Sequence, residues 1–587
     1  MSVAMVKAIT EEDTLENVSM PAYEALRLAV SRKDSADFNE QYFLFLQQFA
    51  EFRNSLAAPD MPDDDSFVPY NPTFGVRASF TLIGSNSAET VSARARKQTS
   101  ALLANGRIAH NIFARLPLKD RLECLAILEK TIRQHQDDIA LTISADTGKP
   151  IANAASEMDK GSKWFADAYE KSWAQLGESR NGKKTKSLEP LGVVQVISAY
   201  NYPYALAIGG IVGALATGNS VIITPSNKAP NWIFPFIRAA KAALAEFAVS
   251  RHGMSTTQKN TLKDYLIQYS IGVNTHLTDE VDLVHFVGSN AVGEAISTSR
   301  MKKHKKTILE LGGNSAVVVM ESALAIADNK GAEGIAKKIF EGFAPATGQR
   351  CTAPRLIFLQ GNTNAVASTL ALLCRTETQQ HTLTGTPCNP FEKHAAMGPL
   401  VDDNARMRME QAIKLAGELG AVVNGGSAEE TSLAVDNNII PGGSCWVNPV
   451  AIDWTHIDTT QLNLSQQEKL NDLLTNETFG PLVHIVKKIN TIQDAVDEVN
   501  LWDKYKLAAA VFTGNPEDTQ IFQQATGITS VVENSGPKDQ SPQGPHGHPW
   551  LDPIGGESHY LLYTRQFTIK SNDGLQRINT QEDMAFA

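Results

Sequence analysis

Apolar residues recur at helical spacing in the segment that begins near Leu118. Four aliphatic side chains follow one another at intervals of three or four positions, at Leu122, Leu125, Leu128 and Ile132. Charged residues stand between them, which is typical of an amphipathic helix. The pattern continues toward Ile143, and Gly148 with Pro150 supplies a stop signal.

The clearest alternation of elements begins at Glu189. Residues 193–197, VVQVI, predict a short buried strand. From Pro203 to Gly218 the chain is apolar on nearly every side and rich in small residues, which predicts a buried helix. Residues 220–223 predict a second strand, so the segment forms a βαβ unit with a right-handed crossover.

The alternation repeats further along the chain. PNWIFPFIRAAKAALAEFA and NAVGEAISTSRMKKH predict helices, whereas VDLVHFVGS and KKTILELGG predict strands. Alternating strands and helices predict an α/β fold with a doubly wound parallel sheet. Such sheets bind ligands at the carboxyl ends of their strands. The residues expected at those ends include Asn201, Thr224, Gly288 and Glu310.

The first 85 residues do not share this pattern. They contain an amphipathic patch, FNEQYFLFLQQFAEF, followed by APDMPDDDSFVPYNP, which is rich in proline and aspartate. The second stretch is typical of a linker or surface loop. We therefore expect residues 1–85 to be an N-terminal extension.

The net charge and the apolar runs of the sequence exclude some classes of protein. The chain of 587 residues carries 53 Lys and Arg against 64 Asp and Glu, a formal charge of −11, which argues against a nucleic-acid partner. The start of the chain has no secretory signal, and the longest apolar run, YALAIGGIVGALA, is too short to span a membrane. We expect a cytoplasmic protein without a membrane partner.

The five cysteines form no C-x-x-C pair, which favours a reducing compartment. His546-Gly547-His548 has no third and fourth ligand close by, so we expect no metal site. Cys351 stands apart, because it follows a Thr-Gly-Gln-Arg turn and precedes the apolar run LIFL. It is either a core thiol, as many cysteines are, or a nucleophile.

Five motifs in order resemble the aldehyde dehydrogenase superfamily, in its NAD(P)-dependent, hydrolytic type. They are EPLGVV with the asparagine after its strand, F-x-G-S-x-x-V-G, LELGG, G-Q-x-C and NETFGPL. The resemblance covers roughly residues 90 to 575. It implies a cofactor-binding domain at 86–310, with an oligomerisation strand at about 175–190, and a catalytic domain at 311–535. Residues 536–587 would then hold the C-terminal loop and, in YTRQFTIKSN, an oligomerisation strand that joins subunits into a homodimer or homotetramer.

The resemblance implies oxidation of an aldehyde to the acid through a cysteine thiohemiacetal and thioester. Cys351 would be the nucleophile, Asn201 would stabilise the oxyanion, and Glu310 would activate water. Read without the family, Glu310 is a strand-end surface acid and Asn201 a turn residue. A second alternative passes the acyl group to coenzyme A, although acylating relatives generally lack the base equivalent to Glu310. A third is a non-catalytic binding protein.

The same resemblance implies contacts to NAD or NADP. Glycines at the turn containing Gly288 and Gly293 would lie under the pyrophosphate, and Glu477 and Phe479 would touch the nicotinamide ribose and ring. Without the family these are turn glycines, a capped turn and a core aromatic residue. The full expected set is Ser198, Ala199, Tyr200, Thr224, Ser226, Asn227, Gly288, Ser289, Gly293, Leu311, Gly312, Glu477 and Phe479.

Two segments depart from the family pattern. In ITPSNKAP, Thr224 replaces the usual lysine and Asn227 the usual acid, and the two changes have opposite effects on acceptance of a 2′-phosphate. Lys228 is a candidate to compensate, so the choice between NAD and NADP stays open. The C-terminal loop, SPQGPHGHPWLDPIGGESHY, predicts an atypical aldehyde substrate, and WTHIDTTQLNLSQQEKLNDLL predicts a polar, partly helical insertion.

Overall fold

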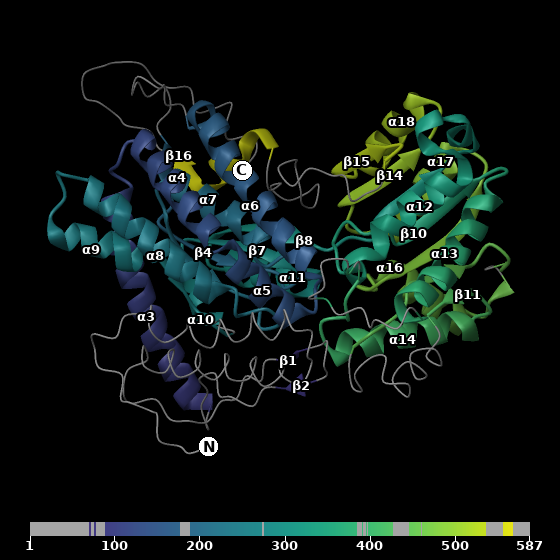
Figure 1. Ribbon diagram of the computed structural model, residues 1–587, viewed down its shortest axis with the longest axis horizontal. Helices are drawn as coiled ribbons and strands as arrows, with labels where there is room; N and C mark the ends of the chain where they lie inside the picture. The colour runs from purple at the N-terminus through teal and green to yellow at the C-terminus, as the bar shows by residue number, and fades with distance from the viewer. Residues whose placement is uncertain are drawn as a thin grey trace.

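Two α/β units lie side by side in the computed structural model of the chain (Figure 1). The structure describes residues 70–71, 76–77, 88–176, 188–272, 275–383, 390, 395, 397–426, 445–458, 461–535 and 556–566. Most of the expected N-terminal extension therefore lies outside the described residues. So do Cys388, the His546–His548 stretch and most of the C-terminal loop.

The first unit is built on a five-stranded, all-parallel sheet. In spatial order its strands are β6 (Ile267–Tyr269), β5 (Ser220–Thr224), β4 (Val193–Ile197), β7 (Leu283–Gly288) and β8 (Lys306–Leu311). The strand order reverses between β4 and β7, which is the point where doubly wound sheets bind ligands. The predicted strands and the βαβ unit are confirmed.

Helices cover both faces of this sheet because its residues are apolar on both sides. Val194 and Val196 of β4 pack into one core with the helices between β4 and β6, while Val193 packs into a second core on the other face. The helices are α3 (Ala88–Phe113), α4 (Leu118–Gln134), α5 (Gln136–Thr147), α6 (Ile151–Gln175), α7 (Ala205–Ala216), α8 (Ile233–Ser250), α9 (Thr256–Tyr265), α10 (Thr275–Glu280) and α11 (Asn290–Met301). The predicted amphipathic helix is α4. The helix is interrupted at His135, and the chain continues as α5, which ends at Gly148 in a left-handed conformation.

The second unit contains a seven-stranded sheet. In spatial order its strands are β11 (Val422–Gly425), β12 (Val450–Asp453), β13 (Leu482–Ile489), β10 (Leu356–Gln360), β9 (Ala316–Val319), β14 (Ala508–Phe512) and β15 (Ser530–Glu533). All neighbours are parallel except β11, an antiparallel edge strand. This confirms the predicted fold class of doubly wound parallel sheets.

Two hydrophobic cores cover the faces of the seven-stranded sheet. One core contains side chains of α12 (Gly331–Phe343) and α13 (Asn364–Leu383). The other contains side chains of α14 (Asp403–Glu418), α16 (Leu464–Thr475), α17 (Ile492–Trp502) and α18 (Pro516–Thr526). Short 3-10 turns are η1 (Glu321–Ala325), η2 (Ala327–Asn329) and η3 (Pro345–Gly348). The polar insertion predicted to be partly helical contains α16, which an Asn463 capping box starts.

The last described segment returns to the first unit (Figure 1). It comprises η6 (Gly556–Tyr563) and β16 (Thr564–Gln566), and β16 pairs antiparallel with β3 (Leu188–Pro190). Tyr563 is fully buried, and its hydroxyl lies 2.7 Å from His285 Nδ1 of β7. Tyr560 donates a hydrogen bond to Asp167 of α6 at 3.0 Å. A separate pair, β1 (Tyr70–Asn71) with β2 (Val76–Arg77), precedes α3.

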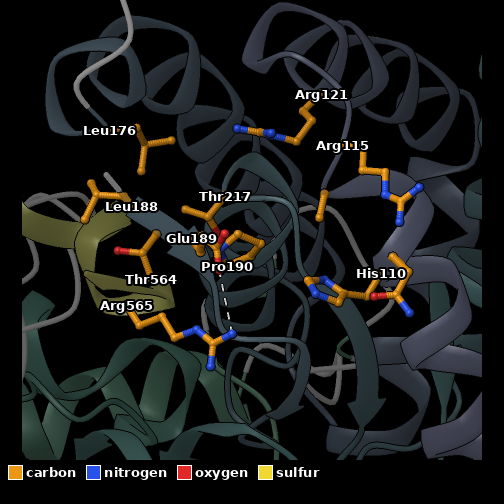
Figure 2. A pocket seen from close by; sticks show the side chains of 12 residues that line it. His110, Arg115, Arg121, Leu176, Leu188, Glu189, Pro190, Thr217, Thr564 and Arg565 are labelled. Carbon is orange, nitrogen blue, oxygen red and sulfur yellow. Dashed lines mark ion pairs between the residues drawn. The ribbon is translucent and has the colours of Figure 1, made fainter. Parts of the chain in front are cut away.

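A cavity of about 350 Å³ lies beside the β3–β16 pair (Figure 2). His110, Arg115 and Arg121 line one side, and the Glu189–Arg565 ion pair lies at the other with a separation of 3.7 Å. Glu189 and Thr217 place this cavity at the amino ends of β4 and β5. Doubly wound sheets bind ligands at the opposite ends, so the chemistry is sought there.

Candidate active site

The carboxyl ends of four strands meet at one edge of the first sheet. Ile197 of β4 pairs with Thr224 of β5, and Gly288 of β7 pairs with Leu311 of β8. Ser198 follows β4, and its backbone N–H donates to the Thr224 carbonyl at 3.1 Å. The predicted cofactor residues Ser198, Thr224, Gly288 and Leu311 therefore lie at the same sheet edge, with Ala199, Tyr200, Ser289 and Gly312 next to them in the chain.

Cys351 lies between η3 and β10 and differs from the other described cysteines. Cys124, Cys374 and Cys445 are buried, whereas Cys351 is partly exposed. Burial of its sulfur raises the pKa of the Cys351 thiol, and the charges of Glu310 and Glu477 raise that pKa further. The backbone N–H groups of Cys351 and Thr352 act in the opposite direction by donating to the sulfur. On balance the pKa of the Cys351 thiol lies above its ordinary value.

A hydrogen bond joins the first unit to the cysteine loop. Asn201, buried in the loop between β4 and α7, donates from Nδ2 to the Gln349 carbonyl at 3.0 Å. Tyr200 donates from its hydroxyl to Gln349 Oε1 at 3.1 Å. Both bonds fix the segment two residues before Cys351. Because an amide nitrogen carries two hydrogens, Asn201 keeps a second donor after serving Gln349.

The cysteine loop has an unusual backbone. Three consecutive residues are left-handed: Ala346, Thr347 and Gly348 have φ values of 55°, 56° and 62°. Left-handed backbone is costly for residues with a Cβ, so neighbouring contacts must hold it in place. A Cβ on Gly348 would lie 2.2 Å from the Gly480 carbonyl oxygen, which leaves room only for glycine.

Arg355 holds this loop in place. Its guanidinium is buried and donates to the carbonyls of Gly348 at 2.6 Å and Gly480 at 2.9 Å. It thereby ties the cysteine loop to the NETFGPL segment. The sequence interpretation assigned no role to Arg355, and its burial had no local signal, because arginine is mostly exposed in folded proteins.

Glu310 is the penultimate residue of β8 and is 4% exposed. Its charge acts on the Cys351 sulfur, so the two groups share one site. The alternative interpretation of Glu310 as a strand-end surface acid is therefore wrong. It failed because β8 ends against the second unit, where the linker from Gly312 to Ser315 leads into β9.

Glu477 and Phe479 lie on the opposite side of the same site. Glu477 accepts a hydrogen bond from the backbone N–H of Gly313, and its Oε1 is sealed from solvent with no hydrogen-bond partner in the described chain. A Cβ on Gly312 would lie 2.2 Å from Glu477 Oε2, so this glycine makes room for the carboxylate. The Phe479 ring packs edge-on against Tyr200, with ring centroids 5.9 Å apart.

Glu477→Gln is expected to remove part of the pH dependence of stability. Burial raises the pKa of Glu477 to about 8, with Asp503 adding to the effect and Arg355 opposing it. An unfolded glutamate titrates near ~4.3, so the folded chain holds this proton over the interval between the two values. The contribution of Glu477 to stability is therefore complete below the unfolded pKa and is lost as the pH rises through about 8.

Thermal unfolding at about pH 6 and about pH 8.5 measures this effect. The Tm of the wild-type chain should fall over that interval by more than the Tm of Glu477→Gln. Equal falls in both proteins would contradict the prediction.

Helix α11 begins at this sheet edge with its first turn open. Its N-cap residue Ser289 makes no side-chain capping bond, and Ser289 is exposed. A Cβ on Gly293 would lie 2.4 Å from Leu311, so this glycine lets the helix pack closely on β8. Asn290 Oδ1 is buried with no hydrogen-bond partner in the described chain. An uncapped helix N-terminus of this kind suits a phosphate.

The segment after β5 is arranged differently from the rest of the edge. The Thr224 hydroxyl accepts a hydrogen bond from Gln195 Nε2 at 2.9 Å and is buried within the sheet. Ser226 is half-buried and Asn227 is exposed. Lys228 forms an ion pair with Asp402 of the second unit at 2.7 Å. Lys228 therefore has a partner, whereas Asn227 makes no hydrogen bond or ion pair to the other predicted cofactor residues in the described chain.

The described residues contain neither a metal-binding cluster nor a membrane-spanning helix. In the placed part of the chain, no group of three or more His, Cys, Asp or Glu is arranged to hold a metal ion. Within the same ranges, no helix is both long and apolar enough to cross a membrane.

The comparisons with known families, sequences and structures agree with one another. A family model described as aldehyde dehydrogenase family matches residues 83–442. A lactaldehyde dehydrogenase of Methanococcus maripaludis is 28% identical over 464 residues, covering 78% of this chain and 88% of the relative. An NADP-dependent glyceraldehyde-3-phosphate dehydrogenase of Streptococcus equinus is 26% identical over 458 residues, covering 76% and 84%. The crystal structure of lactaldehyde dehydrogenase from Escherichia coli matches with a TM-score of 0.66 and 21% identity, covering 86% of this chain and 94% of that one, which supports the fold.

Proposed function

The chain belongs to the aldehyde dehydrogenase family of NAD(P)-dependent oxidoreductases, and from this premise we propose that it oxidises an aldehyde to the carboxylic acid with Cys351 as nucleophile and Glu310 as general base. The observation that carries the proposal is the hydrogen bond from Asn201 to Gln349. It brings an amide donor of the first unit to the loop that holds the partly exposed cysteine.

The first step is addition of the Cys351 sulfur to the aldehyde carbonyl. The bond from sulfur to carbon forms as the thiol proton leaves, and the carbonyl oxygen becomes an oxyanion. Because the pKa of this thiol is raised, its proton must leave as the bond forms, and it would pass to solvent water. The second hydrogen of Asn201 Nδ2 and the Cys351 backbone N–H would stabilise the oxyanion. One such donor is typically worth about 10² to 10³ in rate.

The second step is collapse of the thiohemiacetal to a thioester. NAD(P)⁺, when bound, accepts the hydride that leaves the former aldehyde carbon. This chain's own groups hold the oxyanion and then release it as the carbonyl re-forms. Glu310 would next take a proton from water, which attacks the thioester and frees the acid and the Cys351 thiol. The presence of Glu310 favours hydrolysis over transfer of the acyl group to coenzyme A.

The residues present fit a dinucleotide. The uncapped N-terminus of α11 would hold the pyrophosphate, because backbone N–H groups and the helix dipole favour anions there. Glu477 would accept from hydroxyls of the nicotinamide ribose through Oε1, the atom without a partner in the described chain. Phe479 would lie against the nicotinamide ring. The Ser198–Tyr200 segment would line the site where the strand order reverses between β4 and β7. Thr224, Ser226 and Asn227 would lie near the adenosine ribose.

Both cofactors are accepted under this proposal, since no carboxylate stands at position 227 to repel a 2′-phosphate. Asn227→Glu is expected to raise the KM for NADP roughly tenfold relative to the KM for NAD, because it places a like charge near the phosphate. Asn227→Gln serves as the neutral control. Initial rates with each cofactor measure the two KM values, and an unchanged ratio in Asn227→Glu would show that this residue does not reach the ribose.

We also infer a homodimer or homotetramer. The β3–β16 pair is a two-stranded ribbon, and such an edge invites a strand from another copy. Light scattering on the purified chain measures the assembly, and a monomer at micromolar concentration would contradict it.

A panel of aliphatic, aromatic and semialdehyde substrates tests the main proposal. Each is tried with NAD and with NADP, with and without coenzyme A, and both reduced cofactor and the acid product are measured. Formation of reduced cofactor and free acid in equal amounts supports the proposal. An acyl-coenzyme A product would favour the acylating alternative. If no substrate gave reduced cofactor and neither cofactor bound saturably, the non-catalytic alternative would be favoured.

A further inference from the structure

Tyr202, the residue after Asn201, is surrounded by cations. Lys149 Nζ lies 3.8 Å from the centre of the Tyr202 ring, and Lys160 Nζ lies 4.5 Å from it. Lys149 follows the end of α5, and Lys160 lies in the middle of α6. The loop that holds the proposed oxyanion donor thus contains an aromatic ring with two ammonium groups close to it.

Only part of this positive charge is neutralised. Lys149 forms a buried ion pair with Glu157. Glu157 also accepts hydrogen bonds from the backbone N–H groups of Tyr204 and Ala205, at 3.2 and 3.1 Å, at the start of α7. This carboxylate is therefore committed to Lys149 and to the helix N-terminus. In the described ranges, Lys160 has no carboxylate within ion-pair distance.

A third cation comes from the cysteine loop. Arg350 directly precedes Cys351, and its Nε is buried with no hydrogen-bond partner in the placed part of the chain. Burial alone would raise the pKa of Tyr202, but the charges of Arg350, Lys149 and Lys160 together lower it below the ordinary tyrosine value. The Tyr202 side chain therefore lies in a positive field.

Unpaired cations at a partly desolvated site are costly unless a ligand supplies the opposite charge. Tyr202 follows Asn201 in the chain, and Arg350 precedes Cys351. Asn201 and Cys351 are the two residues that would hold the reacting carbonyl. Arg350 and Tyr202 therefore lie on the same two loops as the reacting groups.

We propose that Arg350, Lys160 and the Tyr202 hydroxyl bind an anionic group at the far end of the substrate, which makes the preferred substrate a short aldehyde bearing a carboxylate, sulfonate or phosphate. This inference rests on the proposed function and names the substrate class of that same site. Arg350 is suited to a planar or tetrahedral oxyanion because its guanidinium presents several donors in a fixed geometry. Lys160 adds a point charge 4.5 Å from the centre of the Tyr202 ring.

Matched substrate pairs test the proposal. Succinic semialdehyde is compared with butanal, and glyceraldehyde 3-phosphate with glyceraldehyde, so that the two pairs separate a carboxylate preference from a phosphate preference. For wild-type protein, kcat/KM for the anionic member of at least one pair should exceed that for the neutral member by roughly tenfold or more. Arg350→Gln and Lys160→Gln should each lower that ratio roughly tenfold, mainly through KM for the anion.

Lys163→Gln is the matched control, since Lys163 is an exposed lysine of the same helix and the substitution removes the same charge. The ratio should be unchanged in this variant. A ratio near one in the wild-type chain, or a ratio that survives both test substitutions, would overturn the inference while leaving the proposed function intact. Failure to oxidise any aldehyde would instead remove the proposed function, and the inference with it.

Binding without turnover gives an independent measurement. Calorimetric titration of Cys351→Ser with succinate and with glycerol 3-phosphate should show saturable binding of at least one anion, and adding Arg350→Gln should weaken that binding roughly tenfold. Equal binding by both proteins would show that the anion lies elsewhere, which contradicts the proposal.

Discussion

Replacement of Cys351 by alanine is expected to abolish aldehyde oxidation, lowering kcat by about 10⁴-fold or more while the chain stays folded. No other described cysteine can take over, because Cys124, Cys374 and Cys445 are buried away from solvent. The side chain removed is small and partly exposed, so little packing is lost. Initial rates of cofactor reduction measure the effect, and far-ultraviolet circular dichroism with a thermal melt shows that the fold persists.

Cys124→Ala is the matched control, since it removes a cysteine that packs in α4. This variant should lose some stability, because a buried sulfur leaves a cavity, and should keep its rate. The raised pKa of the Cys351 thiol adds a further expectation, that alkylation by iodoacetamide accelerates as the pH rises. Retention of more than about one hundredth of the wild-type rate by Cys351→Ala would exclude this residue as the nucleophile.

Glu310→Gln is expected to separate the two halves of the reaction. If Glu310 activates water, its loss should lower steady-state kcat by about 10² to 10⁴ and allow the thioester to accumulate. The single Glu310→Gln variant should then give a burst of about one reduced cofactor per active site before turnover slows. Stopped-flow absorbance measures the burst, and mass spectrometry of the quenched protein detects the acyl group on Cys351.

The control is Glu246→Gln, the same change at an exposed position of α8, which should leave kcat unaltered. A Glu310→Gln variant that shows no burst and a full steady-state rate would mean that another group activates water. A variant with neither burst nor turnover would indicate that Glu310 already acts in the addition step, as the base that removes the thiol proton.

Much of the fold could be predicted because burial is two-sided. The strand at 193–197 and the strand after Gly218 have apolar residues at consecutive positions, which is typical of a parallel strand buried on both faces. The strand ends in turn located Asn201, Thr224, Gly288 and Glu310, which the sheet registers bring to one edge. Local patterns were sufficient here because the burial of each strand can be predicted from its own residues.

The remaining features depend on contacts between distant segments. Nothing near Lys149 or Lys160 indicates that they hold the Tyr202 ring, because α5, α6 and the β4–α7 loop meet only in the folded chain. The ion pair of Lys228 with Asp402 crosses between the two units in the same way. The left-handed backbone at Ala346 and Thr347 carries no residue-type signal, since neither residue favours that conformation.

The return of the last described segment to the first unit has a consequence for biosynthesis. Tyr563 fills space next to Gly213, where an added Cβ would lie 2.4 Å from its ring, and the Asn219 amide donates to the Tyr563 carbonyl at 3.0 Å. A ribosome adds about 5 to 20 residues per second, so synthesis from Leu311 to Tyr563 takes roughly 10 to 50 seconds. During that time the first unit has emerged from the ribosome but lacks the Tyr563 ring that completes its core. Chaperone demand should therefore peak before termination, and a premature stop codon upstream of Gly556 would release a polypeptide whose earliest-made half is already incomplete.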